Sequence, residues 1–450
     1  MYFTFIITTF AYELIVFPHD RLQIPLQMNI EVIKSIIIEG QELLEELKPV
    51  ERAFKFENEG RYVLVGVRQA GKSFLLYLRV KQLIAEGHKL QEMLFINFDD
   101  ERLLGMKAEN LDEILQAYAA LFPYKPIVFL DEIQNIEGWE HFVRRLANRK
   151  YMVYVTGSNA KMLSREIATT LGGRFIEQMV FPYSFREYLS ARGMTLDTNQ
   201  LYGKQKGEAQ RLLNDYFQWG GFPELILFEN KRSWLNSLYE KIILADIIQR
   251  NGIRNEQSMR LTLRRLAENI KTPTSYNRLA NIVKATGSSI SVTSVAEYIK
   301  VCKEACLLFE IENFASKFVE RTTVKKHYFV DNGILNIFLT DSETSLLENI
   351  CAITLYKAYI KDFRNKVYYY NKEWEIDFYI PEQKRAIQAS FSIADAATKE
   401  REVNALREFH KKYGLDRAEI VTYSEEATIE VDSLTIRVIP LLEWLLSNES

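Results

Sequence analysis

A strand that runs into a glycine-rich loop constrains this chain more than any other feature. Residues 62–65 are apolar or β-branched, and the segment from Gly66 to Ser73 reads Gly-Val-Arg-Gln-Ala-Gly-Lys-Ser, a complete G-x-x-x-x-G-K-S pattern. Residues 74–85 then show the apolar period of a helix. The amides of such a loop and the start of the following helix point at a bound anion. The pattern therefore predicts a nucleotide-binding site.

Each position of this phosphate loop has an expected role. Gly66 and Gly71 let the backbone turn tightly and approach the phosphates, and Lys72 adds a full charge at the β- and γ-phosphates. The hydroxyl of Ser73 is a ligand for Mg²⁺. The alternative is a structural glycine turn followed by a solvated lysine. The residues expected to contact the nucleotide are Gly66, Val67, Arg68, Gln69, Ala70, Gly71, Lys72, Ser73 and Phe74.

Two adjacent carboxylates supply the second part of the predicted site. Residues 126–131 form a continuous apolar run that ends in Asp131 and Glu132, as in a parallel strand buried on both faces. In phosphate-loop enzymes the first carboxylate holds the Mg²⁺ shell, and the second orients or deprotonates the attacking water. A solvated turn is the alternative, but the position downstream of a phosphate loop favours the two chemical roles.

A third strand, residues 151–156, is followed by Gly157, Ser158 and Asn159. Polar residues at this point lie at the carboxyl edge of the sheet, where ligands bind in open α/β folds. We therefore expect Ser158 or Asn159 to sense the γ-phosphate. The alternative is an ordinary loop or helix cap, because Ser and Asn are favoured at caps.

An arginine is also expected to meet the charge that develops on the transferring phosphoryl group. Arg174 follows two glycines just ahead of a fifth strand, where a mobile loop could deliver it, and Arg165 lies beside the sensor residues. Arg68, inside the loop, is a third candidate of lower rank. The alternative for each is a surface arginine paired with a carboxylate.

The alternation of strand and helix predicts the fold class. Such alternation in residues 61–181 favours an α/β fold with a parallel, doubly wound sheet. The chain is then strongly helical over 183–271, and Ser184 with Glu187 forms a capping box that needs no catalytic explanation. The expected strands are 61–67, 93–98, 126–131, 151–157 and 174–181.

The segment 274–321 has the order of a winged helix-turn-helix. Residues 275–283 and 291–300 are predicted helices, and 307–314 is a predicted wing strand. Residues 246–326 carry fourteen Lys and Arg against eight Asp and Glu, in a chain whose formal net charge is −3. Such a segment can bind duplex DNA through its phosphates, and it can equally be a module that docks a protein partner.

Together these motifs resemble the AAA+ ATPases, and more narrowly a bacterial and archaeal family with a carboxy-terminal domain of unknown function shaped like a restriction-type nuclease. The resemblance covers nearly the whole chain after about Met28. It implies ATP and Mg²⁺ as ligands. Besides the phosphate loop, its marks are 130–134, 139–145, 156–158, 163–167, 181–187, 220–224 and 328–333.

The resemblance also implies a domain order and a test of the nuclease-like part. The expected divisions are a leader or over-extended start (1–27), the AAA+ core (28–182), a helical lid (183–273), the winged helix (274–326) and the nuclease-like α/β domain (327–450).

An active nuclease needs several carboxylates for a metal ion and a lysine to position water. Gln388 stands where an acid is expected and Ser390 where the lysine is expected, so Glu348, Glu375 and Asp377 are interpreted as remnants of an inactive site. The alternative is that Lys399, from the next helix, replaces the lysine, but the acid is missing as well.

The composition places limits on the remaining choices. A chain of 450 residues that is 47% hydrophobic can build two or three domains. Its three cysteines match neither a disulfide framework nor a zinc site and fit a reducing cytoplasm, and no segment is expected to enter a membrane. We expect a Mg²⁺-dependent ATPase that couples hydrolysis to a conformational change. The alternatives are a nucleotide-gated switch with negligible turnover and a DNA-cutting enzyme, and a homo-oligomer is left open.

Overall fold

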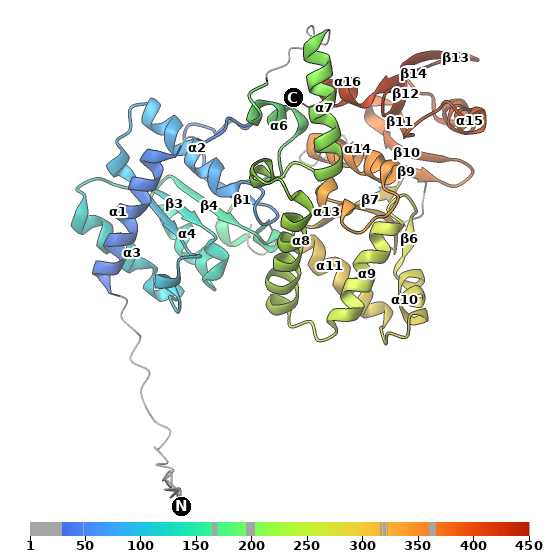
Figure 1. The fold of residues 1–450 in the computed structure, drawn as a ribbon. Coiled ribbons are helices and arrows are strands. Elements are labelled where there is room, and N and C mark those ends of the chain that lie inside the picture. The colour runs from blue at the N-terminus through green and yellow to red at the C-terminus, as the bar shows by residue number, and fades with distance from the viewer. Residues whose placement is uncertain are drawn as a thin grey trace, which may run out of the picture.

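The computed structural model describes residues 29–47, 49–163, 169–194, 203–315, 317, 321, 323–359 and 366–449. Figure 1 shows two sheets in different parts of the chain, the first in blue to teal and the second in yellow to red. Helices from the middle of the sequence lie between them. Within the described part of the chain, no helix is long and apolar enough to cross a membrane.

The first sheet has five parallel strands in the order β2-β3-β4-β1-β5. Its three inner strands, β1, β3 and β4, are buried along their whole length, which explains their continuous apolar sequence. The five strands fall at the predicted positions, so the predicted α/β fold with a parallel sheet is confirmed. Their bounds are β1 Tyr62–Val65, β2 Met93–Asn97, β3 Ile127–Asp131, β4 Val153–Gly157 and β5 Ile176–Met179.

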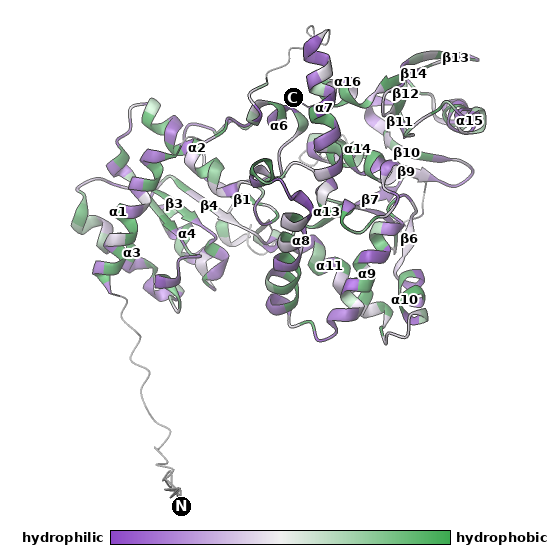
Figure 2. Cartoon of the chain, viewed as in Figure 1, coloured by the Kyte–Doolittle hydropathy of each residue, from purple (hydrophilic) through white to green (hydrophobic). Residues whose placement is uncertain are grey.

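Amphipathic helices cover this sheet. Helix α4 buries Trp139, Phe142 and Leu146 while its other residues are mostly polar, and Figure 2 shows the same division into green and purple around the helices near the sheet. The helices are α1 Ile30–Glu46, α2 Lys72–Ala85, α3 Leu111–Leu121 and α4 Trp139–Asn148, with the 3₁₀ turns Leu90–Glu92, Glu101–Leu103, Ala108–Asn110, Ile133–Asn135 and Ala160–Leu163.

A helical region follows the first sheet. Helix α6 begins at the predicted capping box, in which the Ser184 side chain accepts from the amide of Glu187 and the Glu187 carboxylate accepts from the amide of Ser184. One element is a π-helix, a form that is rare beyond a single turn and often marks functional sites. The elements are α6 Phe185–Ala191, α7 Lys204–Trp219, the 3₁₀ turn Pro223–Leu227, α8 Lys231–Lys241, the π-helix η8 Ile242–Gln249 and α9 Glu256–Glu268.

The second sheet has nine strands in the order β13-β14-β12-β11-β10-β9-β7-β8-β6. The division expected after residue 326 falls inside β8, and β7 pairs in parallel with β9, so the strands on both sides of that boundary share one sheet. The strands are β6 Thr274–Ser275, β7 Leu308–Asn313, β8 Val324–Phe329, β9 Tyr368–Asn371, β10 Glu375–Ile380, β11 Arg385–Ala389, β12 Arg417–Thr422, β13 Ala427–Val431 and β14 Leu434–Pro440. The helices are α10 Tyr276–Ala285, α11 Val292–Glu304, α13 Asn332–Asn336, α14 Glu343–Tyr359, α15 Ala396–Tyr413 and α16 Leu441–Asn448, with the 3₁₀ turn Pro381–Gln383.

Two motifs far apart in the sequence contact each other next to α7. The buried carboxylate of Asp331 accepts from the amides of Gly221 and Gly333, each at 2.7 Å. Gly220 has a φ of 78°, and a Cβ placed on it would lie 2.0 Å from the Asp331 carboxylate. The motifs 220–224 and 328–333 are therefore explained by packing, since they join the helical region to the second sheet.

Candidate nucleotide site

The phosphate loop begins where the central strand β1 ends. β1 lies between β4 and β5, so the loop leaves the middle of the sheet. A Cβ on Gly66 would lie 2.0 Å from the carbonyl oxygen of Val180, which follows β5. Only glycine allows this approach of two backbones. The loop then turns through Gly71, which has a φ of 91°, into α2 at Lys72.

The Lys72 side chain lies inside the site, with 3% of its surface exposed. Its ammonium donates to the carbonyl oxygen of Val67 at 3.2 Å and lies 3.4 Å from Oε1 of Glu132. The lysine of the loop and the carboxylate that follows β3 are therefore neighbours. A lysine with one carboxylate partner can exchange that partner for an anionic ligand.

Asp131 ends β3 and is almost completely buried. The hydroxyls of Thr156 and Ser73 both donate to its carboxylate. Burial, together with the neighbouring Glu132 carboxylate, raises the pKa of Asp131 to about 6. The carboxylate and the Ser73 hydroxyl form a compact set of oxygen atoms, which is the type of ligand that Mg²⁺ prefers.

Glu132 is held in place from two directions. Its amide donates to the Thr156 hydroxyl at 3.0 Å, and Nε2 of Gln134 donates to its carboxylate at 2.5 Å. Burial alone would raise the pKa of Glu132, but Lys72 and Gln134 outweigh burial and hold that pKa below its ordinary value. The carboxylate is therefore charged and oriented. Thr156 and Gln134 both lie in motifs noted in the sequence, but neither was predicted to have a role.

The predicted sensor residues have different surroundings. Ser158 is buried, and its hydroxyl accepts from Nε2 of Gln134 at 3.3 Å, so it is linked to Glu132. Asn159 instead accepts from the amide of Lys161 at 2.9 Å, which is the capping arrangement considered as its alternative. The structure thus brings Ser158 to the carboxylates and uses the Asn159 side chain in a turn.

The three candidate arginines differ in their surroundings, and of the two that the structure describes only Arg68 is close enough to the carboxylates for its charge to act on Glu132. Arg174 is exposed and its guanidinium donates to the carbonyl oxygen of Gly172 in its own loop, at 3.4 Å. Arg165 lies outside the described residues. Arg68 donates two hydrogen bonds, of 2.9 and 3.0 Å, to the carboxylate of Asp246 on the π-helix η8. Asp246 is buried and was not singled out from the sequence, since it lies far from the loop along the chain.

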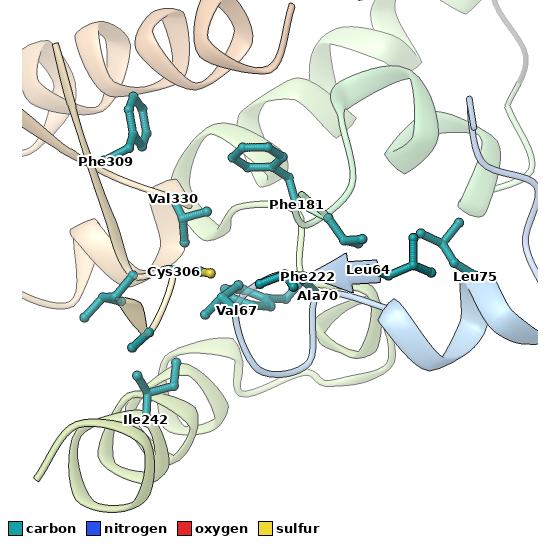
Figure 3. Close-up of a cluster of buried hydrophobic side chains, with 14 of the residues drawn as sticks. Leu64, Val67, Ala70, Leu75, Phe181, Phe222, Ile242, Cys306, Phe309 and Val330 are labelled. Atoms are coloured by element: carbon teal, nitrogen blue, oxygen red, sulfur yellow. The ribbon is translucent and has the colours of Figure 1, made fainter. Parts of the chain in front are cut away.

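Residues that follow the five-stranded sheet in the chain cover one side of the phosphate loop. Figure 3 shows Val67 and Ala70 of the loop among Phe222, Ile242 and Cys306, with all five buried. Polar contacts add to this packing. Nη1 of Arg52 donates to the carbonyl oxygen of Ala70 at 3.1 Å, and Nε2 of Gln69 donates to Glu224 at 3.4 Å. The loop is therefore in contact with the helical region and with the turn after α11.

A cavity of about 270 Å³ adjoins the phosphate loop. The segment before β1 contributes Arg52 and Phe54, and α2 contributes Leu75. The opposite wall includes Lys357 of α14, so the second half of the chain also lines this space. Arg52 is fixed by the Glu187 carboxylate, with bonds of 2.8 and 2.9 Å. The remaining lining residues are Ala53, Gln178, Met179, Val180, Phe181, Ser184, Glu187, Thr354, Ala358, Asn448 and Glu449.

A larger cavity, of about 610 Å³, lies in the second sheet. Glu348, Glu375 and Asp377 all line it, so the structure brings the three predicted acidic residues together. The hydroxyl of Ser390 donates to the carbonyl oxygen of Ser392. Lys399 is exposed on α15 and is not among the residues that line the cavity. The lysine that contacts the three carboxylates is Lys326 of β8, which the sequence analysis did not single out.

The predicted basic segment forms helices α10 and α11 and the strand pair β7–β8. Lys284 and Lys300 are exposed on the two helices, but Lys300 lies 3.8 Å from Glu304 on its own helix, and Lys303 is paired with Glu310 at 2.8 Å. Lys161, next to the sensor residues, lies 3.3 Å from Glu304 at the end of α11. Part of the positive charge of this segment is thus neutralised internally.

Three family descriptions match successive parts of the chain. Residues 58–189 match the AAA domain, residues 210–345 match a domain of unknown function designated DUF8612, and residues 343–444 match another, designated DUF4143. The first match covers the five-stranded sheet and the phosphate loop. Together with the observed fold, it supports a nucleotide-binding domain of the P-loop AAA type.

Similar proteins extend over most of the chain. An uncharacterized protein of Methanocaldococcus jannaschii is 29% identical over 432 residues, which is 92% of this chain and 95% of that protein. An uncharacterized protein of Haemophilus influenzae is 26% identical over 399 residues, 85% of this chain and 94% of that protein. Among solved structures, a Walker-type ATPase of Pyrococcus abyssi has a TM-score of 0.39 at 12% identity, covering 69% of this chain and 95% of that one.

Proposed function

We propose that this protein binds ATP with Mg²⁺ at the phosphate loop and hydrolyses it. The observation that carries the proposal is the meeting of Lys72, Ser73, Asp131 and Glu132 at one edge of the sheet, with Glu132 charged and held by Gln134. Loop amides and Lys72 would hold the phosphates, and Ser73 and Asp131 would hold the metal ion. When bound, Mg²⁺ neutralises the charge that develops on the phosphates.

Glu132 would orient and deprotonate the water that attacks the γ-phosphate. Its carboxylate is ionised and its position is fixed by Thr156 and Gln134. In this structure Lys72 contacts Glu132, so nucleotide binding would draw the ammonium toward the phosphates and release the carboxylate for water. Ser158, linked to Gln134, is well placed to report the state of the γ-phosphate.

The 270 Å³ cavity beside the loop would receive the nucleobase. It adjoins the phosphate site through Arg52, which bonds to the loop, and through Leu75 of α2. Its mixed apolar and polar lining suits a flat heterocycle, since pockets of this kind combine apolar walls with a few fixed polar groups. Because Lys357 belongs to the second half of the chain, base binding would depend on both halves.

The test is to measure nucleotide binding and steady-state phosphate release by the full chain with Mg²⁺. Binding together with release supports the ATPase, whereas binding without release would assign the alternative function, a nucleotide-gated switch that acts on a protein partner. Absence of ATP and ADP binding would overturn both.

We keep Arg174 as an arginine finger supplied to the site of a neighbouring subunit, because it is exposed in its own chain. In that case the specific activity should rise with protein concentration.

We further propose that the nucleotide state is transmitted to the second half of the chain. Arg68 of the loop is bound to Asp246 of η8, and Arg250 of the segment that follows η8 lies 3.3 Å from the same carboxylate. Val67 and Ala70 belong to the same buried cluster as Phe222 and Cys306 (Figure 3). A nucleotide that moves the loop must therefore shift these contacts.

A second candidate function is binding of duplex DNA through residues 274–326. It is favoured by the positive excess of 246–326 and by exposed Lys284 and Lys300 on neighbouring helices. The order of helices and paired strands is compatible with a winged helix. If phosphate contacts dominate, affinity should fall at least tenfold between about 50 and 200 mM salt. Lys284→Glu with Lys300→Glu should weaken it further, and absence of salt-sensitive binding would favour a protein partner.

We also assign the protein to the cytoplasm. The three cysteines, Cys302, Cys306 and Cys351, are buried free thiols, and such residues persist most readily in a reducing compartment. Detection of the protein in fractionated cells would test this assignment.

A further inference from the structure

Lys326 lies at the centre of the carboxylate cluster in the second sheet. Its side chain has no exposed surface. Its ammonium lies 2.9 Å from Oε1 of Glu348, 3.1 Å from Oδ1 of Asp377 and 3.2 Å from Oε1 of Glu375. One positive group thus contacts three carboxylates that belong to two different elements.

The surrounding protein fixes both the lysine and its partners. Lys326 is on β8, and α14, which carries Glu348, packs against that strand. Oε1 of Glu348 also accepts from the Tyr328 hydroxyl at 2.8 Å, and Oδ2 of Asp377 accepts from the amide of Ala389 at 3.0 Å. The ammonium also lies 5.8 Å from the centre of the Tyr369 ring.

Gln388, which stands where an acid was expected, is fully used in hydrogen bonds. Its carbonyl oxygen accepts from the amide of Asp377 at 2.9 Å. Its amide donates to the carbonyl oxygen of Glu375 at 2.9 Å and to the Glu402 carboxylate at 2.8 Å. The side chain therefore holds β10, β11 and α15 together.

This lysine offsets part of the charge of the cluster, since one ammonium faces three carboxylates. Burial alone would lower the pKa of Lys326, but Glu348, Asp377 and Glu375 outweigh burial and raise that pKa well above its ordinary value. Burial raises the pKa of Glu348, and Lys326 opposes this rise. The ammonium thus does for these carboxylates what a metal ion does in a metal-dependent nuclease.

We propose that Lys326 is a built-in cation that occupies the place of a divalent metal ion, so that this cavity is closed to metal-dependent chemistry. The residues present do not fit a metal ion, because the oxygens that would approach it at about 2.0 to 2.6 Å already contact an ammonium. A divalent ion could reach these oxygens only by displacing the ammonium, which repels it at close range. Across the described ranges, no group of three His, Cys, Asp or Glu side chains is arranged to hold a metal.

The experiment compares Mn²⁺ binding by the full chain without nucleotide, using wild type, Asp377→Asn and Lys326→Met. Wild type and Asp377→Asn should bind the same amount of Mn²⁺, because Asp377 is not a metal ligand when Lys326 is present. Lys326→Met leaves three carboxylates without a cation and should gain one Mn²⁺ site. That site should disappear in Lys326→Met with Asp377→Asn.

Thermal unfolding supplies a second readout. Lys326→Met should melt at a lower temperature than wild type, and millimolar Mn²⁺ should raise its melting temperature by about 3 °C or more while leaving wild type unchanged. The proposal is overturned if Asp377→Asn removes a Mn²⁺ site from wild type, or if folded Lys326→Met gains none. Plasmid cleavage by wild type with Mg²⁺ or Mn²⁺, lost in Asp377→Asn, would also overturn it. If Lys326→Met does not fold, the wild-type and Asp377→Asn titrations decide.

Discussion

The phosphate loop and the second sheet each bury a lysine among carboxylates, with opposite consequences. Lys72 has one carboxylate neighbour, Glu132 at 3.4 Å, and a backbone carbonyl oxygen. Lys326 contacts three carboxylates at 2.9 to 3.2 Å. A buried ammonium with a single carboxylate partner can exchange that partner for an anionic ligand, whereas an ammonium held by three carboxylates cannot leave them without exposing buried, unpaired negative charge. The number of carboxylates that contact the ammonium therefore distinguishes a lysine that can bind a ligand from a lysine with a structural role.

The largest expected effect compares the two lysines directly. Lys72→Ala should lower ATP affinity on the order of a hundredfold, because charge-assisted contacts to the phosphates are lost. Lys326→Met should leave ATP affinity within about twofold, since its contacts lie in the second sheet. Calorimetric titration below the melting temperature of both variants measures this. Equal losses of ATP affinity in the two variants would contradict the different roles given to the two lysines.

The two carboxylate partners supply a second pair of variants. Glu132→Gln should keep ATP binding and slow phosphate release at least tenfold, because a group that orients water acts mainly in the chemical step. Glu375→Gln, which changes a half-exposed partner of Lys326, is the matched control and should leave release unchanged. Wild-type turnover in Glu132→Gln would show that its role is wrongly assigned.

The smallest expected effect tests the contact between the phosphate loop and the π-helix η8. Asp246→Asn removes the charge that holds Arg68, so the guanidinium becomes free to meet the phosphates and ATP affinity should rise by about threefold to tenfold. Asp215→Asn, which breaks the Lys231 pair in the helical region, is the control and should have no effect on affinity. Unchanged affinity in Asp246→Asn, with nucleotide still bound, would reject the coupling and leave the ATP site standing.

The sequence by itself determined the first sheet and the candidate nucleotide site within it. Gly66 to Ser73 are contiguous, and a phosphate loop works through the backbone of neighbouring residues, so a local pattern suffices. Asp131 and Glu132 were also predictable, because a buried parallel strand has a plain apolar signature and its end marks the edge of the sheet.

Only the tertiary structure decided which distant residues would meet. Asp246 reaches Arg68 because η8 packs beside the loop, and the linear sequence carries no signal for that contact. Lys326 meets Asp377 because β8 joins β10 through β7 and β9 in one sheet, although the predicted domain boundary separated them. Local periodicity fixes whether a segment is a strand or a helix, but not which strands become neighbours. Clusters built across a sheet therefore depend on strand order and long-range packing.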